Sequence, residues 1–319
     1  MQMKKCFLSI LPAIAFLACS EANVEAAESH QEVAQAVKQE DKKEVAVQPN
    51  IKSEELGGGF YMLTGPGGNI GVSTGDDGVF VIDDKFARFG EEIIETIKTL
   101  SDQPIRFVVN THYHGDHTGG NTHLKATGAT VVAHENVRTR MGLTFENKLF
   151  GRTINAVEPE QWPDLTFSEN ATFYMNGEEA QVIHTPNAHT DGDAIIYFVE
   201  ANILHMGDNF FNGLFPYIDV DSGGSLQGMI AAHQVALDLI NDDTRVIPGH
   251  GPLATKNDLK TAQSVLITVQ SRVKSQIDEG KNLDMIIASA PLADMSKYSA
   301  FIDEDNMVRI AYASLANND

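Results

Sequence analysis

The chain repeats one coarse pattern, in which several short β-rich runs are followed by an amphipathic helix. In the first series GFYMLTG, NIGVST and GVFVIDD are separated by Gly and Asp turns, and EEIIETIKTL follows with apolar residues at helical spacing. In the second series ATFYMN, AQVIHT, AIIYFV and NILHMG precede the amphipathic segment LQGMIAAHQVALDLI. Because each sheet has to bury a hydrophobic face against another layer, the pattern predicts two sheets packed face to face with helices outside.

Residues 1–18 are predicted to be a signal peptide. Lys4 and Lys5 precede the apolar run CFLSILPAIAFLAC, which is too short to span a bilayer. The stretch FLACS resembles a bacterial lipobox, in which Cys19 would carry a lipid anchor, and the alternative is ordinary cleavage after a small residue such as Ala26. We therefore expect an exported, periplasmic protein that is either soluble or lipid-anchored to a bacterial membrane.

The composition changes twice along the chain. Residues 19–50 are rich in Glu, Gln, Ala and Lys and contain no aromatic residue, so a disordered acidic linker is predicted there. Residues 51–319 are predicted to form one domain, with a core at about 55–260 and C-terminal helices at 261–319. Within it, the segment from Glu135 to about Pro163 has weak periodicity and is expected to be irregular, with some helix.

Charge and cysteine content narrow the classes of partner and of metal site. The formal net charge of −21 argues against nucleic acid as a partner. Cys6 and Cys19 are the only cysteines, so the predicted domain can form neither a disulfide nor a thiolate metal site. A small-molecule substrate is the expected partner, and no protein partner is predicted.

The segment THYHGDHTGG begins at Thr111 and directly follows the predicted strand IRFVVN. His112 and His114 alternate, as two residues on the same side of an extended segment would. Asp116 and His117 follow a glycine at which the chain can turn. A zinc ion takes three or four protein ligands, so these residues exceed the need of one ion and suit two ions close together.

Three further candidate ligands each follow a predicted strand far along the chain. His189 follows AQVIHTPNA, Asp208 follows NILHMG, and His250 follows TRVIPG. Sites usually lie in loops at the ends of strands, and the small residues beside each candidate let the backbone approach a metal ion. The other histidines of the domain are interpreted as core or surface residues: His123, His134, His184, His205 and His233. Of these, His184 and His205 are expected to lie near the site.

The motifs HYHGDH, AHTDGD, GD and PGHG, in this order, resemble those of the metallo-β-lactamase superfamily over about residues 55–260. The resemblance implies an α+β fold, an αββα four-layer sandwich with a dinuclear site, usually zinc, at one edge. The expected cofactor is therefore two Zn²⁺ per chain, with iron or manganese as alternatives. The implied ligands are His112, His114 and His189 for the first ion, Asp116, His117 and His250 for the second, and Asp208 as a bridge.

A hydroxide that bridges two such ions would make the chain an acyl hydrolase. The bond would be that of an ester, thioester, lactone, amide or lactam. We expect Asp116 and Asp208 to orient the hydroxide, and Asn212 and Tyr217 are candidate donors to the oxyanion. The aromatic stretch around Tyr217 predicts an apolar wall beside the metals, and the alternative is that these side chains are core residues beneath a loop.

The bridging position favours one branch of the superfamily. Asp208 resembles the glyoxalase II and lactonase-like branch, because the best-known β-lactamases place cysteine there or leave the second ion without that ligand. Those β-lactamases also often use a lysine shortly afterwards, whereas no Lys or Arg occurs from Thr153 to Thr244. The alternatives are a β-lactamase proper and a mononuclear iron sulfur-oxygenase that resembles persulfide dioxygenases. A degenerate binding protein is disfavoured because all seven ligand positions are filled.

Two further groups of residues have open interpretations. Three carboxylates are candidates to orient the ligating histidines, with turn formation or capping as the alternative. Asp83 is implied by the resemblance, because it matches a family position near the metals, and Asp191 and Asp193 lie close to His189 in the sequence. A basic segment is a candidate flap over an anionic substrate, with ordinary solvated charges as the alternative. Its basic residues are Arg138, Arg140, Lys148 and Arg152.

Overall fold

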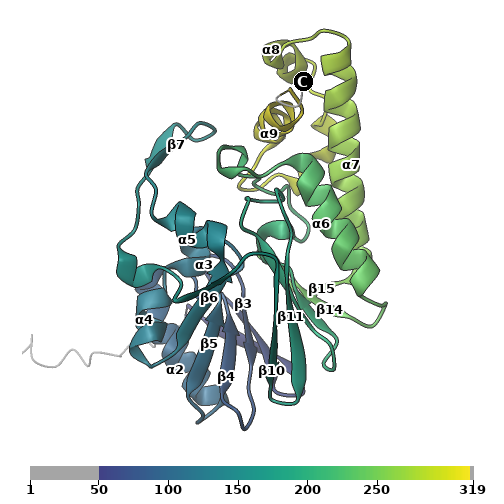
Figure 1. Cartoon of the computed structure of the whole chain (residues 1–319). Helices are drawn as coiled ribbons and strands as arrows, with labels where there is room; N and C mark the ends of the chain where they lie inside the picture. The colour runs from purple at the N-terminus through teal and green to yellow at the C-terminus, as the bar shows by residue number, and fades with distance from the viewer. Residues whose placement is uncertain (1–49, 317–319) are drawn as a thin grey trace, which may run out of the picture. The chain divides into compact units, whose positions relative to one another are not determined.

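The structure is a computed structural model that describes residues 50–316 (Figure 1). The predicted signal peptide, with Cys19 just after it, lies outside the described residues, as does all of the predicted linker except Asn50. Export and lipidation therefore stay predictions. Within residues 50–316, no helix combines the length and the apolar composition needed to cross a membrane.

The first sheet has seven strands. They are β1 (Lys52–Gly57), β2 (Phe60–Thr64), β3 (Ile70–Ser73), β4 (Val79–Ile82), β5 (Ile105–Val109), β6 (Thr130–His134) and β9 (Leu165–Phe167). The first four pair antiparallel in sequence order, and β5, β6 and β9 continue the sheet in parallel. Because the carboxyl ends of parallel strands share one edge, the residues that follow β4 and β5 lie side by side there.

The second sheet has six strands, which lie in sequence order. They are β10 (Asn170–Met175), β11 (Glu178–His184), β12 (Ala194–Phe198), β13 (Ile203–His205), β14 (Arg245–Ile247) and β15 (Ala254–Thr255). All neighbours are antiparallel except β13 and β14, which pair in parallel and are connected through the helix α6 (Leu226–Leu239). The loops after β13 and β14 therefore emerge at the same edge.

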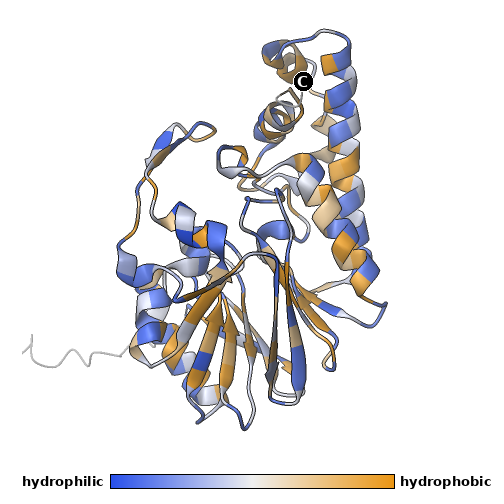
Figure 2. Cartoon of the chain, in the orientation of Figure 1, coloured by the Kyte–Doolittle hydropathy of each residue, from blue (hydrophilic) through white to orange (hydrophobic). Residues whose placement is uncertain are grey.

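A hydrophobic core fills the space between the two sheets. Three phenylalanines, one each from β2, β4 and β12, meet there: the ring of Phe198 lies 4.7 Å from that of Phe60 and 5.8 Å from that of Phe80. Figure 2 shows the hydrophobic residues concentrated in the strands of both sheets. Each of these rings is almost fully buried, as the facing layers of a sandwich require.

Helices cover the outer face of each sheet (Figure 1). On the first sheet, α2 (Gly90–Leu100) contributes Ile93 and Ile97, and α4 (Asn121–Ala126) contributes Leu124 to one buried cluster. On the second, Ala236 of α6 and Leu259 of α7 (Lys256–Asp278) belong to another. The helix–sheet–sheet–helix order confirms the predicted α+β fold with four αββα layers.

The C-terminal helices pack against the loop of residues 210–220, which follows β13. A capping box between Thr255 and Asp258 starts the long helix α7, and α8 (Leu283–Ala288), η5 (Ala293–Tyr298) and α9 (Glu304–Ala316) follow. Val269 of α7 and Met307 of α9 share a buried cluster with Phe215 from that loop. The packing of these helices fixes the path of residues 210–220.

The segment that was expected to be irregular contains more order than its periodicity indicates. It forms the helix α5 (Glu135–Met141), a separate two-stranded hairpin of β7 (Phe145–Asn147) and β8 (Arg152–Ile154), and the turn η2 (Pro159–Gln161). Strands of three residues are too short to show an alternating pattern in the sequence. In Figure 1 this hairpin rises above the sandwich on the side of the first sheet.

Candidate metal centre

The seven predicted ligands come from loops at one edge of the two sheets. His112 and His114 follow β5, and the short helix α3 (Gly115–Thr118) then carries Asp116 and His117. His189 lies between β11 and β12, Asp208 lies in the turn η3 (Gly207–Asn209) after β13, and His250 follows β14. The structure brings all of them into two adjoining groups of potential metal ligands.

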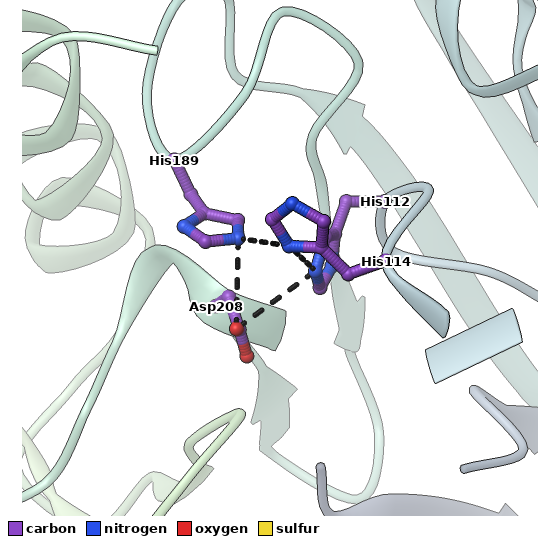
Figure 3. Close-up of side chains that lie close together, drawn as sticks. All are labelled: His112, His114, His189 and Asp208. Carbon is purple, nitrogen blue, oxygen red and sulfur yellow. Dashed lines mark hydrogen bonds and ion pairs between the residues drawn. The ribbon is translucent and has the colours of Figure 1, made fainter. Parts of the chain in front are cut away.

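The first group consists of His112, His114, His189 and Asp208 (Figure 3). Nδ1 of His114 lies 3.1 Å from Nε2 of His112 and 2.8 Å from Nε2 of His189. One ligand atom from each residue lies within 4.8 Å of every other. Figure 3 shows the imidazoles and the carboxylate converging on a common point.

The second group consists of Asp116, His117 and His250. Oδ2 of Asp116 lies 3.8 Å from Nε2 of His117 and 3.4 Å from Nε2 of His250. The ring of His250 stacks on Phe211 at 5.0 Å between centroids, which fixes the plane of the imidazole. Two imidazoles and a carboxylate in this arrangement are suitable ligands for a second divalent cation.

Asp208 faces both groups. Its Oδ1 lies 3.0 Å from Nε2 of His117, and its Oδ2 lies 3.6 Å from Nε2 of His189 and 3.4 Å from Nε2 of His250. His117 Nε2 and Asp208 Oδ1 are buried and close together, but the pair lacks the geometry of a hydrogen bond, and neither atom has a hydrogen-bond partner among the described residues. Unpartnered polar atoms in the middle of a buried cluster fit a cation between the two groups.

Hydrogen bonds at the outer nitrogens fix which way the histidines present their lone pairs. His189 Nδ1 donates to the carbonyl of Tyr217 at 2.8 Å, and His114 Nε2 donates to Asp219 at 3.1 Å. A carbonyl or carboxylate oxygen can only accept, so each of these rings keeps an unprotonated nitrogen that points into the cluster. Bare nitrogens 2.8–3.1 Å apart repel unless a cation lies among them, so the residues present fit a bound metal ion.

Asp83 connects the two sides of this network. Its Oδ2 accepts from His117 Nδ1 at 2.7 Å and from the hydroxyl of Thr111 at 2.8 Å, and its Oδ1 accepts from the Thr111 amide at 2.7 Å. The Thr111 hydroxyl donates its proton to Asp83, so its oxygen accepts a hydrogen bond from His112 Nδ1, which lies 3.0 Å away. Asp83 therefore orients a histidine of each group, as predicted for that position.

Burial and neighbouring charges shift the pKa values of the histidines in the two groups in opposite directions. Burial lowers the pKa of His112 well below its usual value and that of His189 to about 4, so both are neutral and able to bind a metal ion. Burial alone would also lower the pKa of His250, but the carboxylates of Asp208 and Asp116 outweigh it and raise this pKa to about 9. In the metal-free protein the second group therefore holds protons, which a metal ion would displace.

Sequence reasoning missed Asp219. Its Oδ2 accepts from His114 and also from the hydroxyl of Tyr113 at 2.5 Å. Burial alone would raise the pKa of Asp219, but the interaction with His114 and the hydrogen bond from Tyr113 hold it well below its usual range. The sequence signal was weak, because Asp219 and Asp221 are equivalent candidates in the stretch IDVD.

The two other carboxylates proposed as orienting residues shape loops. Asp193 accepts from the amide and the hydroxyl of Thr190 at 2.7 and 2.6 Å, which turns the chain after His189. Asp191 forms a two-point ion pair with Arg140. The role of Asp193 corresponds to the turn alternative, whereas the ion pair of Asp191 corresponds to neither interpretation.

The remaining histidines include two that support the turn η3. His205 Nδ1 accepts from the amide of Gly207 at 3.1 Å, and His233 Nε2 donates to the carbonyl of Asn209 at 2.6 Å. These bonds lie on either side of Asp208 in the chain. His184 stacks on His134 with 3.8 Å between the ring centroids, on the strands that lead to the site.

A cavity of about 610 Å³ opens above both groups. His114, Asp116, Asp208, His250 and Tyr217 are among the residues that line it. The hydroxyl of Tyr217 accepts from the Asn147 amide at 2.5 Å. Burial raises the pKa of Tyr217 above its usual range, so its hydroxyl stays protonated and can donate to a bound substrate.

The structure places Asn212 away from this cavity. Its side-chain amide donates to the carbonyl of Pro252 at 3.0 Å, and the residue lines a second cavity of about 320 Å³ behind the loop. The aromatic stretch divides in the same way: Phe211, Leu214 and Phe215 line the larger cavity, whereas Phe210 is a core residue. The predicted apolar wall is therefore present in part.

Residues 63–250 match the metallo-beta-lactamase superfamily, and the chain belongs to that superfamily. The match spans more than half of the chain and ends at the last of the seven ligand residues. The chain is thus a member of a superfamily of metallo-hydrolases and carries a metal-binding group of histidines and aspartates.

Several relatives share part of the sequence. The hydroxyacylglutathione hydrolase GloC of Haemophilus influenzae is 26% identical over 180 residues, which cover 55% of this chain and 82% of that protein. The hydroxyacylglutathione hydrolase of Methylococcus capsulatus is 32% identical over 106 residues, 33% of each protein. An uncharacterized protein of Aquifex aeolicus is 32% identical over 161 residues, 50% of this chain and 73% of that protein. The chain spans only about a third of the Methylococcus relative.

Solved structures show the same fold. The metallo-beta-lactamase from Pontibacter korlensis superposes with a TM-score of 0.56 at 21% identity, covering 68% of this chain and 98% of that one. The inverting sec-alkylsulfatase Pisa1 from Pseudomonas sp. superposes with a TM-score of 0.61 at 18% identity, covering 83% of this chain and 50% of that one. At these identities the likeness concerns the fold alone.

Proposed function

We propose that this protein is a dinuclear zinc hydrolase that cleaves an acyl bond, with a thioester or ester as the preferred class. The observation that carries the proposal is the position of Asp208, whose carboxylate lies within 3.0–3.6 Å of histidine nitrogens from both groups beneath one cavity. A single ion would occupy only one of these groups and leave the other group of potential ligands without a metal. The similarity to hydroxyacylglutathione hydrolases supports a thioester.

The residues of this chain would divide the work as follows. His112, His114 and His189 would hold one ion, Asp116, His117 and His250 the other, and Asp208 would contact both. Two bound zinc ions would supply a water ionised near neutral pH and a Lewis acid for the carbonyl oxygen. The protein would provide the fixed orientation of each ligand, through Asp83, Asp219 and the Tyr217 carbonyl.

Two side chains have a direct role towards the substrate in this proposal. Burial alone would raise the pKa of Asp116, but the charge of His117 and the hydrogen bond from His250 outweigh it and lower this pKa to about 2, so Asp116 stays a carboxylate that would accept a hydrogen bond from the attacking water and orient it. Tyr217 stays protonated and donates to the oxygen on which negative charge develops. Asn212 is not assigned this role, because its amide is occupied by the Pro252 carbonyl.

A dedicated β-lactamase is the less favoured function. The residue at the position between the two groups is Asp208, and no lysine or arginine occurs from Thr153 to Thr244 to hold a substrate carboxylate in the way those enzymes do. The charge balance of the chain is acidic throughout that stretch. We therefore place β-lactams among the test substrates and not at the centre of the proposal.

The test combines metal content with turnover. The purified protein, supplied with zinc or with iron, is analysed for both metals and assayed on thioester, aryl-ester, lactone and β-lactam substrates with and without chelator. We expect about two zinc ions per chain and turnover that chelator abolishes and zinc restores. In His189→Ala and His250→Ala each variant should lose a different ion. One iron per chain together with oxygen consumption on sulfur compounds would overturn the hydrolase in favour of a sulfur-oxygenase.

A further inference from the structure

The basic segment over residues 138–152 contains four cations, and three of them have partners. Arg138 donates to a backbone carbonyl, and its guanidinium lies 5.1 Å from the centroid of an indole ring. Arg140 holds a carboxylate with two bonds, at 3.1 and 2.6 Å, and Lys148 Nζ lies 3.0 Å from another carboxylate oxygen. The carbonyl and the indole beside Arg138 belong to Pro163 and Trp162. The carboxylate held by Arg140 is that of Asp191, and the one beside Lys148 is that of Asp221.

Arg152 differs from the other three. Its side chain is exposed on β8, it lines the cavity above the metal-binding groups, and it forms no ion pair with any residue in the range 50–316. Its guanidinium lies 5.3 Å from the centroid of the Phe150 ring, which leaves its hydrogen-bond donors free. Besides the histidines of the metal-binding groups, Arg140 and Arg152 are the basic residues that line the cavity, and Arg140 is already neutralised.

The wall beside Arg152 is apolar. Phe150 lies 5.3 Å from Phe301, which comes from the C-terminal region and is 68% exposed. These two rings line the cavity together with the side chains of Phe211, Leu214 and Phe215. Exposed aromatic rings at the rim of a cavity mark a surface that an apolar ligand would cover.

We propose that the substrate is an acyl compound with an apolar body and an anionic group at the end remote from the bond that is cleaved, and that Arg152 binds this anion. The inference rests on the proposed function, because it places the cleaved bond over the metal-binding groups. The planar guanidinium offers paired donors that match a carboxylate. In a chain with a net charge of −21, such a contact also counters the repulsion that an anionic substrate meets.

Matched substrates test the proposal on the zinc-loaded enzyme. The p-nitrophenyl monoester of adipic acid ends in a carboxylate, and the corresponding ester of adipic acid monoamide is neutral and of the same length. We expect kcat/KM to favour the carboxylate by about three- to tenfold, the range of one charge-assisted hydrogen bond at a hydrated position. Arg152→Gln should bring this ratio to about one, whereas Arg152→Lys should keep part of it.

Lys148→Gln is the matched control, because Lys148 lies on the same hairpin segment but does not line the cavity. It should leave the ratio unchanged, and raising the salt concentration should lower the ratio in the wild type and in Lys148→Gln but not in Arg152→Gln. Arg152 is exposed, its guanidinium lies against Phe150, and it is paired with none of the metal-binding residues, so its replacement should alter neither the zinc content nor the melting temperature. A ratio that Arg152→Gln leaves unchanged would overturn the proposal.

A binding measurement separates this inference from the proposed function. 6-(4-Nitrophenoxy)hexanoic acid and its primary amide carry an ether in place of the ester, and calorimetry gives their affinities without turnover. We expect the acid to bind about three- to tenfold more tightly, and this difference to vanish in Arg152→Gln. If no acyl substrate is hydrolysed but the ethers still discriminate through Arg152, the hydrolase proposal fails alone. If esters are hydrolysed and Arg152→Gln discriminates like the wild type, only the anion site fails.

Discussion

His117 Nδ1 donates to Asp83 Oδ2 across 2.7 Å, between two side chains that are fully buried. This bond joins the ends of two neighbouring parallel strands, since Asp83 follows β4 and His117 lies in the helix that begins after β5. A carboxylate in this position fixes the tautomer of a metal-binding imidazole and raises its basicity. The relationship therefore connects the folding of the first sheet to the affinity of the second metal site.

We predict that Asp83→Asn weakens the second metal site. The amide of asparagine is a poorer acceptor than the carboxylate, and it cannot accept from His117 and from both donors of Thr111 equally well. The expected loss of affinity for the second ion is about 10- to 100-fold. Titration with a zinc-buffered indicator measures it. Two zinc sites of unchanged affinity would show that the bond only shapes the fold.

Asp219 should have the equivalent role for the first site. Asp219→Asn removes the charge that holds His114 Nε2, and we expect the first ion to bind about 10- to 100-fold more weakly. Asp221→Asn is a close control, because Asp221 lies two residues away and pairs with Lys148 at the surface. The control should keep both zinc ions. Equal losses in the two variants would mean that the whole loop, and not the contact with His114, determines the affinity.

The proposed metal ligands were predictable from the sequence, but the residues that orient them were predictable only in part. His112, His189 and Asp208 follow strands whose apolar runs are readable, and glycines or small residues mark the turns. Asp219 lies 105 residues from His114 in the chain, and its position depends on the packing of the C-terminal helices against the loop 210–220. Such long-range packing leaves no local pattern. Asp83 was identifiable only through the family resemblance.

The hairpin that carries Arg152 was missed for a different reason. Its strands have three residues each, and only one residue in them, Asn147, is buried. A strand this short and this exposed shows no alternation of apolar and polar residues. The basic composition of the segment was visible in the sequence, but which of its cations would be left without a carboxylate depends on Asp191 and Asp221, more than 50 residues further along.

Gly68 is predicted to be indispensable for the second site. A Cβ atom at this position would lie 2.1 Å from Cε1 and 2.3 Å from Nε2 of His117, so the ring would have to move. Gly68→Ala should therefore weaken the second ion by about tenfold or more, with the first ion retained. Gly115→Ala, next to the site, meets no atom within 4 Å and should bind both ions. Metal analysis after dialysis against a weak chelator distinguishes the variants.

Lys85 should make stability depend on pH. The side chain is buried, its ammonium group donates to the Gly68 carbonyl, and burial lowers its pKa to about 8 from 10.5. Between these values the unfolded chain binds one proton more than the folded chain. The free energy of unfolding therefore rises with pH, by about 1.4 kcal/mol per unit from this group.

Lys85→Met removes this contribution. Urea unfolding at pH 8, 9 and 10, at one zinc concentration, should give a wild-type curve that gains stability relative to the variant as the pH increases. At pH 10, where the cost of the lowered pKa has largely disappeared, the variant should be less stable by about 1–3 kcal/mol, because the Gly68 carbonyl loses its buried donor. Parallel pH profiles would show that Lys85 has an ordinary pKa in the folded protein.

Tyr217→Phe separates transition-state stabilisation from metal binding. The hydroxyl lines the cavity, accepts from Asn147 and stays protonated, whereas the His189 ring is held by the backbone carbonyl of the same residue. The substitution keeps that carbonyl, so both zinc ions should remain. If the hydroxyl donates to the developing oxyanion, kcat should fall by about 100-fold, the lower end for loss of one such donor, with KM nearly unchanged. A loss confined to KM would instead show that Tyr217 contributes equally to the bound substrate and the transition state, and therefore positions the substrate without lowering the barrier.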